Sequence, residues 1–68
     1  MRLSARNVFK GKVVNIEKGA VNATVKVDIG AGNVVTSMVT VEAVNDLGIQ
    51  VGGEVNIVIK ASSVMLGV

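Results

Sequence analysis

The sequence lacks the side chains on which most catalytic and metal sites depend. Its 68 residues include no cysteine and no histidine, which excludes a disulfide framework, a thiolate metal site and a histidine general base. Proline, tryptophan and tyrosine are also absent, and Phe9 is the only aromatic residue. A base-stacking platform for nucleic acid uses several aromatic side chains, and this chain does not supply them.

Charge is also scarce and is unevenly distributed. Charged residues make up 18% of the chain, compared with about 25% in an ordinary globular domain. The first 18 residues carry five basic side chains and one acidic one, whereas the remainder carries two basic and four acidic ones. Nucleic-acid modules usually show a stronger basic stripe than this. A small, local anion site therefore fits the charge balance better than a long polyanion.

Long hydrophobic runs are missing although the chain is apolar. No run approaches the ~20 residues of a membrane span, and no apolar segment of about 7–15 residues follows the charged N-terminus, so we expect neither a membrane helix nor a signal peptide. Yet half of the residues are hydrophobic and the mean hydropathy is +0.61. One small domain over residues 1–68 buries only about 60% of its unfolded surface. The apolar surplus therefore predicts burial between subunits of an obligate oligomer.

Alternation of apolar and polar residues with a period of two predicts β-strands. The alternation is clearest in one segment, whose apolar positions are Val21, Ala23, Val25, Val27 and Ile29. Similar segments separated by turn residues predict four more strands, over residues 8–17, 34–41, 54–60 and 64–68.

Glycines predict where this chain turns and bends. Lys18–Gly19 is expected to join the first two strands as a hairpin, and Gly30–Asn33 is the next turn. Gly11 lies inside the first strand, where it suits a bulge or a sharp bend. Further along the same strand, Val14 and Ile16 are expected on one face.

A short helix is predicted over residues 41–47. Thr40 suits its N-cap, Glu42 lies in the first turn, and Gly48 can adopt the left-handed C-terminal cap. Three strands, a helix and two strands follow the order of the OB fold. We therefore predict an all-β, OB-fold-like five-stranded barrel with one short helix between strands 3 and 4. A five-stranded barrel of another topology is the alternative.

The acid–base groups of the chain do not form a catalytic pattern. Glu42 and Asp46 are four residues apart on the predicted helix, which places like charges on one solvated face. Gly30–Gly32 lacks the residues that complete a phosphate-binding motif. We find no nucleophile–base pair and no metal-ligand cluster, so an enzyme is the least favoured interpretation.

Hydrogen-bond donors are the polar groups that remain. Arginine and lysine supply positive charge, arginine can bond two oxygens at once, and hydroxyls complete a shell without net charge. Such a set suits a compact oxyanion, although each residue alone also fits a strand end, a cap or a solvated terminus. The donors before the first predicted strand, on the third, and at or after the end of the fourth are Ser4, Arg6, Asn7, Thr36, Ser37, Thr40, Lys60, Ser62 and Ser63.

Four segments together closely resemble the molbindins, which are small cytoplasmic molybdate-binding proteins. These segments are Ser4–Asn7, Lys10–Val14, Val35–Ser37 and Ile59–Met65, and the resemblance covers nearly the whole chain in one register. It implies an OB-like barrel that assembles as a hexamer, a trimer of dimers, and binds molybdate or tungstate between subunits. It further implies the free-standing form, a cytoplasmic protein for molybdenum storage and homeostasis, with no nucleic-acid or membrane partner.

The resemblance also implies which residues contact the anion. A neighbouring subunit would supply Thr36 or Ser37, and the choice between these hydroxyls stays open. No cation is expected to be coordinated directly. The contacts within one subunit, carried over by position, are Ser4, Arg6, Lys60, Ala61 and Ser62.

A second class of anion site is implied on a three-fold axis, with backbone amides near Gly19, Ala20 and Val21. Two other functions stay open beside molybdate binding. An OB-type nucleic-acid-binding domain would show aromatic residues on its second and third strands and a basic groove, which this sequence lacks. A purely structural oligomerisation module would use the polar residues only as caps and rim.

The apolar surplus predicts that the chain has no stable folded monomer. Analytical ultracentrifugation at micromolar concentration should therefore show an oligomer, because a single small domain cannot cover its hydrophobic side chains. A folded monomer at that concentration would refute this prediction.

Overall fold

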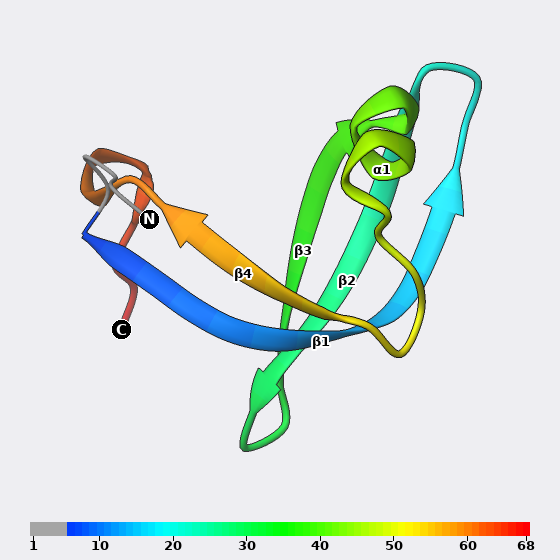
Figure 1. Cartoon of the computed structure of the whole chain (residues 1–68). Helices are drawn as coiled ribbons and strands as arrows, with labels where there is room; N and C mark the ends of the chain where they lie inside the picture. Colours follow the sequence, from blue (N-terminus) through cyan, green and yellow to red (C-terminus); the bar gives the residue numbers. More distant parts are fainter. Residues whose placement is uncertain (1–5) are drawn as a thin grey trace.

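The computed structural model describes residues 6–68, so Ser4 lies outside the described part. The elements follow as β1 (Asn7–Lys18), β2 (Asn22–Gly30), β3 (Asn33–Thr40), α1 (Val41–Leu47), β4 (Glu54–Ile59) and the 3-10 helix η1 (Ala61–Ser63). The strands form one strongly curled sheet, and α1 lies over one end of β2 and β3 (Figure 1). The predicted all-β class is confirmed, and so is the order of the first three strands, the helix and the fourth strand. No helix in the described part has the length and hydrophobicity to cross a bilayer.

Strand β1 holds the sheet together because it pairs with two partners. Its C-terminal part runs antiparallel to β2, and its N-terminal part runs antiparallel to β4, from Asn7 opposite Ile59 to Lys12 opposite Glu54. Strand β2 also pairs with β3, so the order is β3-β2-β1-β4. Residues 7–11 and 55–59 therefore form a two-stranded extension of the sheet, here called the β1–β4 ribbon.

The helix α1 begins and ends where the sequence predicts, at Val41 and Leu47. The Thr40 hydroxyl oxygen accepts a hydrogen bond from the Ala43 amide at 3.0 Å, and Gly48 closes the helix with a φ of 65°. Val44, only 1% exposed, packs into the core. Caps and one apolar anchor thus explain a helix that its length alone would leave marginal.

The hydrophobic core is small. Strand β2 contributes alternate residues to it, as predicted, and the turn at Gly30–Asn33 also forms as predicted. No polar side chain is buried within residues 6–68. The buried residues are Val13, Ala23, Val25, Val27 and Val44.

The predicted faces of β1 are wrong beyond its middle. A β-bulge shifts the register between the pairs Val13–Val27 and Asn15–Lys26. Because a bulge adds one residue, Val13 and Ile16 face the core while Val14 is exposed.

The glycine in β1 serves a close crossing of strands. Its pairing with β4 runs through Gly11 without a shift, so the bulge does not lie there. A Cβ atom at Gly11 would lie 2.5 Å from Val27 Cγ1 and 2.9 Å from the Asp28 carbonyl oxygen. The absent side chain therefore lets the bent strand β1 pass close over β2 (Figure 1).

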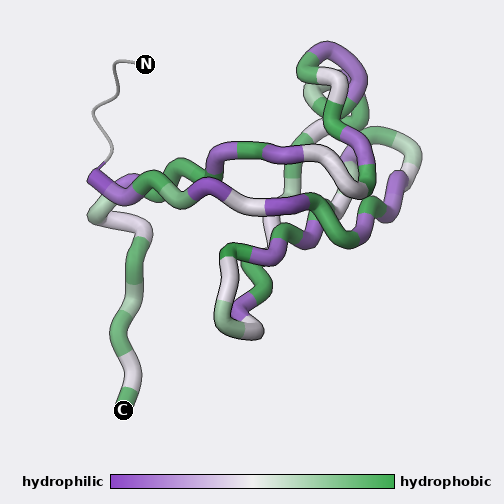
Figure 2. Tube along the Cα trace, turned by 60° about the horizontal axis from the view of Figure 1, so that its bottom comes forward, coloured by the Kyte–Doolittle hydropathy of each residue, from purple (hydrophilic) through white to green (hydrophobic). Residues whose placement is uncertain are grey.

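The predicted strand over residues 64–68 does not form. After β4 the chain makes η1 and then continues without regular structure, with Met65 93% and Leu66 95% exposed. In Figure 2 this largely hydrophobic segment extends away from the sheet. A strand needs a partner for its backbone groups, and residues 6–68 of one chain offer none beside it. The described sheet therefore has four strands, and one edge each of β3 and β4 stays unpaired within it.

The close crossing at Gly11 makes a specific prediction for stability. Gly11→Ala should lower the free energy of unfolding by about 1–3 kcal/mol, because the added methyl group must push β1 away from β2. Gly67→Ala is the matched control, since nothing lies within 4 Å of a Cβ there. Urea unfolding followed by circular dichroism measures both variants. Equal stability of the two would show that β1 does not need this close approach.

Candidate functional site

The candidate anion ligands on one chain gather at the tip of the β1–β4 ribbon. Arg6 directly precedes β1, and Lys60 directly follows β4. The last strand pair is Asn7–Ile59, so the two cationic residues lie one step beyond it on opposite strands. Ala61 and Ser62 follow in η1, and Figure 1 shows η1 beside the start of β1. All four of these residues are exposed.

The two cations at the tip form an arrangement that favours an anion. Lys60 keeps an extended backbone, with φ −63° and ψ 135°, and like charges at cross-strand positions destabilise each other. The side-chain hydrogen bonds within residues 6–68 involve neither Arg6 nor Lys60. An oxyanion between them would replace repulsion by charge-assisted hydrogen bonds.

The hydroxyls of β3 lie on the opposite edge of the sheet from β4. Thr36 is exposed on the outer face, opposite Lys26, whereas Ser37 is half-buried on the inner face. One chain therefore does not bring either of them to the ribbon tip. A site that combines them with Arg6 and Lys60 needs a second copy.

Thr40 is a third hydroxyl at the end of β3. It caps α1 as predicted, with its oxygen accepting from Ala43. Accepting that bond leaves the hydroxyl hydrogen available to donate, and the side chain is exposed. The helix cap was the expected role of Thr40, and its second use as a donor is visible only once the cap geometry is known.

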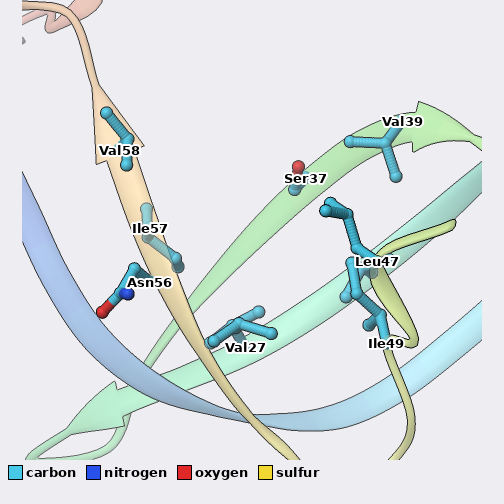
Figure 3. A pocket seen from close by; sticks show the side chains of 10 residues that line it. Val27, Ser37, Val39, Leu47, Ile49, Asn56, Ile57 and Val58 are labelled. Atoms are coloured by element: carbon cyan, nitrogen blue, oxygen red, sulfur yellow. The ribbon is translucent and has the colours of Figure 1, made fainter. Parts of the chain in front are cut away.

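An apolar groove separates β3 from β4. It encloses about 290 Å³, and Figure 3 shows Ser37 and Val39 on β3 across the groove from Ile57 and Val58 on β4. Its other apolar walls include Leu47 and Ile49. The groove lies where another strand would close a five-stranded barrel. Its lining suits burial of apolar side chains, and it lacks the cations of the ribbon tip.

The predicted second anion site falls on the turn between β1 and β2. The Gly19 amide already donates to the Asn22 carbonyl oxygen at 2.8 Å. Ala20 and Val21 line a pocket of about 450 Å³ that also contains Glu42 and Asp46. Two carboxylates repel an anion, so a single chain does not favour this site. It stays a prediction of the resemblance.

The chemistry available at the ribbon tip is binding by donation. Within residues 6–68, no group of three or more acidic side chains is arranged to hold a metal ion. The charged and hydroxyl side chains at the tip donate hydrogen bonds to oxygen, and the cations supply compensating charge. The arrangement therefore suits an oxyanion with several acceptor oxygens.

Comparisons with known proteins identify similar sequences and folds. The TOBE domain family matches residues 3–66. The chain is 57% identical over 68 residues to the Haemophilus influenzae protein named "Probable molybdenum-pterin-binding protein", covering 100% of this chain and 99% of that protein.

Solved structures show the same fold. The structure of MopII from Clostridium pasteurianum (apo2) has a TM-score of 0.91 and 42% identity, covering 98% of this chain and 100% of that chain. A structure of the cytoplasmic molybdate-binding protein ModG with molybdate bound has a TM-score of 0.95 and 54% identity, covering 100% of this chain and 48% of that chain. The predicted OB-like fold is confirmed by these likenesses.

Proposed function

Since the chain belongs to the TOBE domain family and, within it, to the molbindins, we propose that it binds molybdate between the subunits of an oligomer. Its role is molybdenum storage and homeostasis in the cytoplasm. The observation that carries the proposal is the pair of cations, Arg6 and Lys60, brought together at the ribbon tip beside the donors of η1. Tungstate, which is close to molybdate in size, binds at the same site.

The donor set matches the chemistry of this ligand. Molybdate is a tetrahedral dianion without a proton at neutral pH, and Arg6 and Lys60 balance its two charges. Ser62, the backbone at Ala61 and Ser4 complete the shell, and burial between subunits strengthens each charge-assisted bond. Hydrogen phosphate is disfavoured because its O–H needs an acceptor, whereas the Arg6 and Lys60 side chains can only donate. Sulfate is rejected by its smaller size.

The apolar surface of a single chain supports an oligomer. A two-stranded ribbon is marginal by itself, and in this one both Val8 and Phe9 are exposed. The groove between β3 and β4 and the exposed segment with Met65 and Leu66 add further apolar surface. A second copy that covers these surfaces would bring its β3 hydroxyls to the ribbon tip. We propose the hexamer, a trimer of dimers, that the resemblance implies.

Other functions fit the described residues less well. Nucleic acid finds neither aromatic stacking residues nor a strong basic groove. A pterin, which the names of relatives mention, presents both donors and acceptors, whereas the two charged side chains of the ribbon tip can only donate. Binding rather than catalysis is proposed, because the tip supplies no activated nucleophile. A purely structural oligomerisation module remains the alternative that titration with anions separates from molybdate binding.

Calorimetry tests the site directly. Molybdate should bind the purified protein, and sulfate and phosphate should bind far more weakly. Arg6→Ala should weaken molybdate binding by at least about 1.5–3 kcal/mol, the contribution of a hydrogen bond to a charged group. Lys12→Ala is the matched control: it removes one positive charge from the same strand, at a position opposite Asp28 and Glu54.

The control should bind molybdate like the unchanged protein. No heat of binding with any of the three anions would leave the structural module as the function. Equal affinity of Arg6→Ala and the unchanged protein would place the anion elsewhere.

Subunit mixing tests whether two chains build the site. Thr36→Val, Ser37→Ala and Thr40→Gly remove the β3 hydroxyls one at a time, and glycine preserves a helix start at small cost. The variant that loses affinity is then unfolded and refolded together with Arg6→Ala. Mixed oligomers should regain some high-affinity sites, because one interface then holds both intact halves. No recovery on mixing, or no loss from any hydroxyl, would contradict a site shared between subunits.

A further inference from the structure

Asn7 has a distinctive place at the ribbon tip. It is the first residue of β1, it is half-buried, and its Nδ2 donates to the Ile59 carbonyl oxygen at 3.2 Å. Arg6 precedes Asn7 and Lys60 follows Ile59, so this hydrogen bond joins the two residues that adjoin the cations. Resting on the proposed function, we infer that Asn7 is a positioning residue, which holds Arg6 and Lys60 in the arrangement that binds the anion.

The two strand ends at the ribbon tip need a hydrogen bond that holds them together. Strand ends fray when few contacts hold them, and the ribbon has no third strand beside Asn7–Gly11 within the described residues. Repulsion between Arg6 and Lys60 adds a force that separates the strands when no anion is present. A tip ordered in advance also reduces the entropy that anion binding must otherwise cost.

The bond acts on Lys60 through the backbone. The Ile59 carbonyl and the Lys60 amide belong to one planar peptide group, so fixing the oxygen also orients the Lys60 N–H. On its other side, the Lys60 carbonyl oxygen accepts from the Ser63 amide at 2.8 Å. Lys60 is thereby held before and after its Cα atom.

No other side-chain hydrogen bond within residues 6–68 lies at the tip. The remaining three connect Lys18 with Asn45, the Gly30 amide with Asp28, and Ala43 with Thr40. All three lie at turns or at the helix. Among the described side chains, only Asn7 therefore forms a hydrogen bond that connects the two strand ends at the tip.

Asn7 is a positioning residue and not a ligand. Its amide nitrogen gives one of its two hydrogens to Ile59, and it shares the inner face of β1 with Gly11, while Val8 is exposed. The period of two puts the residue before Asn7 on the face of Val8. Loss of Asn7 should therefore weaken the site without removing an anion contact.

The test replaces Asn7 by leucine, which has a similar branched shape and no donor. In calorimetry with molybdate, Asn7→Leu should raise Kd about tenfold, the effect typical of groups that orient ligands, with the number of bound anions unchanged. Hydrogen exchange of the Ser63 amide, which donates to the Lys60 carbonyl oxygen, should become faster in the anion-free protein, while exchange in β2 and β3 stays the same. Asn7→Gln, which keeps the donor, should recover part of the affinity.

Asn15→Leu is the matched control, since Asn15 is exposed on the same strand and takes no part in the side-chain hydrogen bonds of residues 6–68. It should leave Kd unchanged. If the protein without substitutions binds no molybdate, both the proposed function and this inference are wrong. If it binds and Asn7→Leu binds equally well, only the role of Asn7 is wrong, even if the variant melts earlier. Should Asn7→Leu not fold, Asn7→Ser, whose side chain is too short for the bond, is judged by the same outcomes.

Discussion

The twelve-residue strand β1 pairs with two strands, β2 along its C-terminal part and β4 along its N-terminal part. This double pairing curls the sheet, and it requires β1 to bend closely over β2, where a Cβ atom at position 11 would clash with Val27. The same pairing leaves residues 7–11 with β4 alone, so the ribbon extends beyond the core. The position of the ribbon, the open groove between β3 and β4 and the location of the candidate site all follow from it.

In the proposed function, the ribbon tip forms half of a binding site. Antiparallel pairing converts two residues far apart in sequence, Arg6 and Lys60, into neighbours, and their mutual repulsion is relieved when an anion lies between them. The hydroxyls of β3 are held on the opposite edge of the sheet. The apolar surfaces that one chain leaves exposed adjoin both halves. Association of copies and binding of an oxyanion are therefore expected to stabilise each other, because each brings together groups that the other needs.

Local sequence signals were sufficient wherever a short segment determines its own conformation. The period-two pattern located β2 and β3, and Thr40 with Gly48 placed the ends of α1 correctly. The signals failed where contacts between segments distant in sequence determine the conformation. The bulge beyond Val13 depends on how β1 bends over β2, and the segment after Ser63 reads as a strand although no strand of the same chain pairs with it.

By itself, the sequence determined the all-β class, the helix caps, a set of hydrogen-bond donors and the lack of a nucleophile–base pair. These features depend on residue type and on neighbours along the chain. The resemblance that its motifs carry supplied the ligand and the residues proposed to contact it. Only the tertiary structure decided that Arg6 and Lys60 adjoin the same strand pair, Asn7–Ile59, while Thr36 and Ser37 lie on the opposite edge of the sheet. It also revealed that Asn7 ties the two strands at that point. Strand pairing brings together residues separated by dozens of positions, and no local pattern encodes which ones meet.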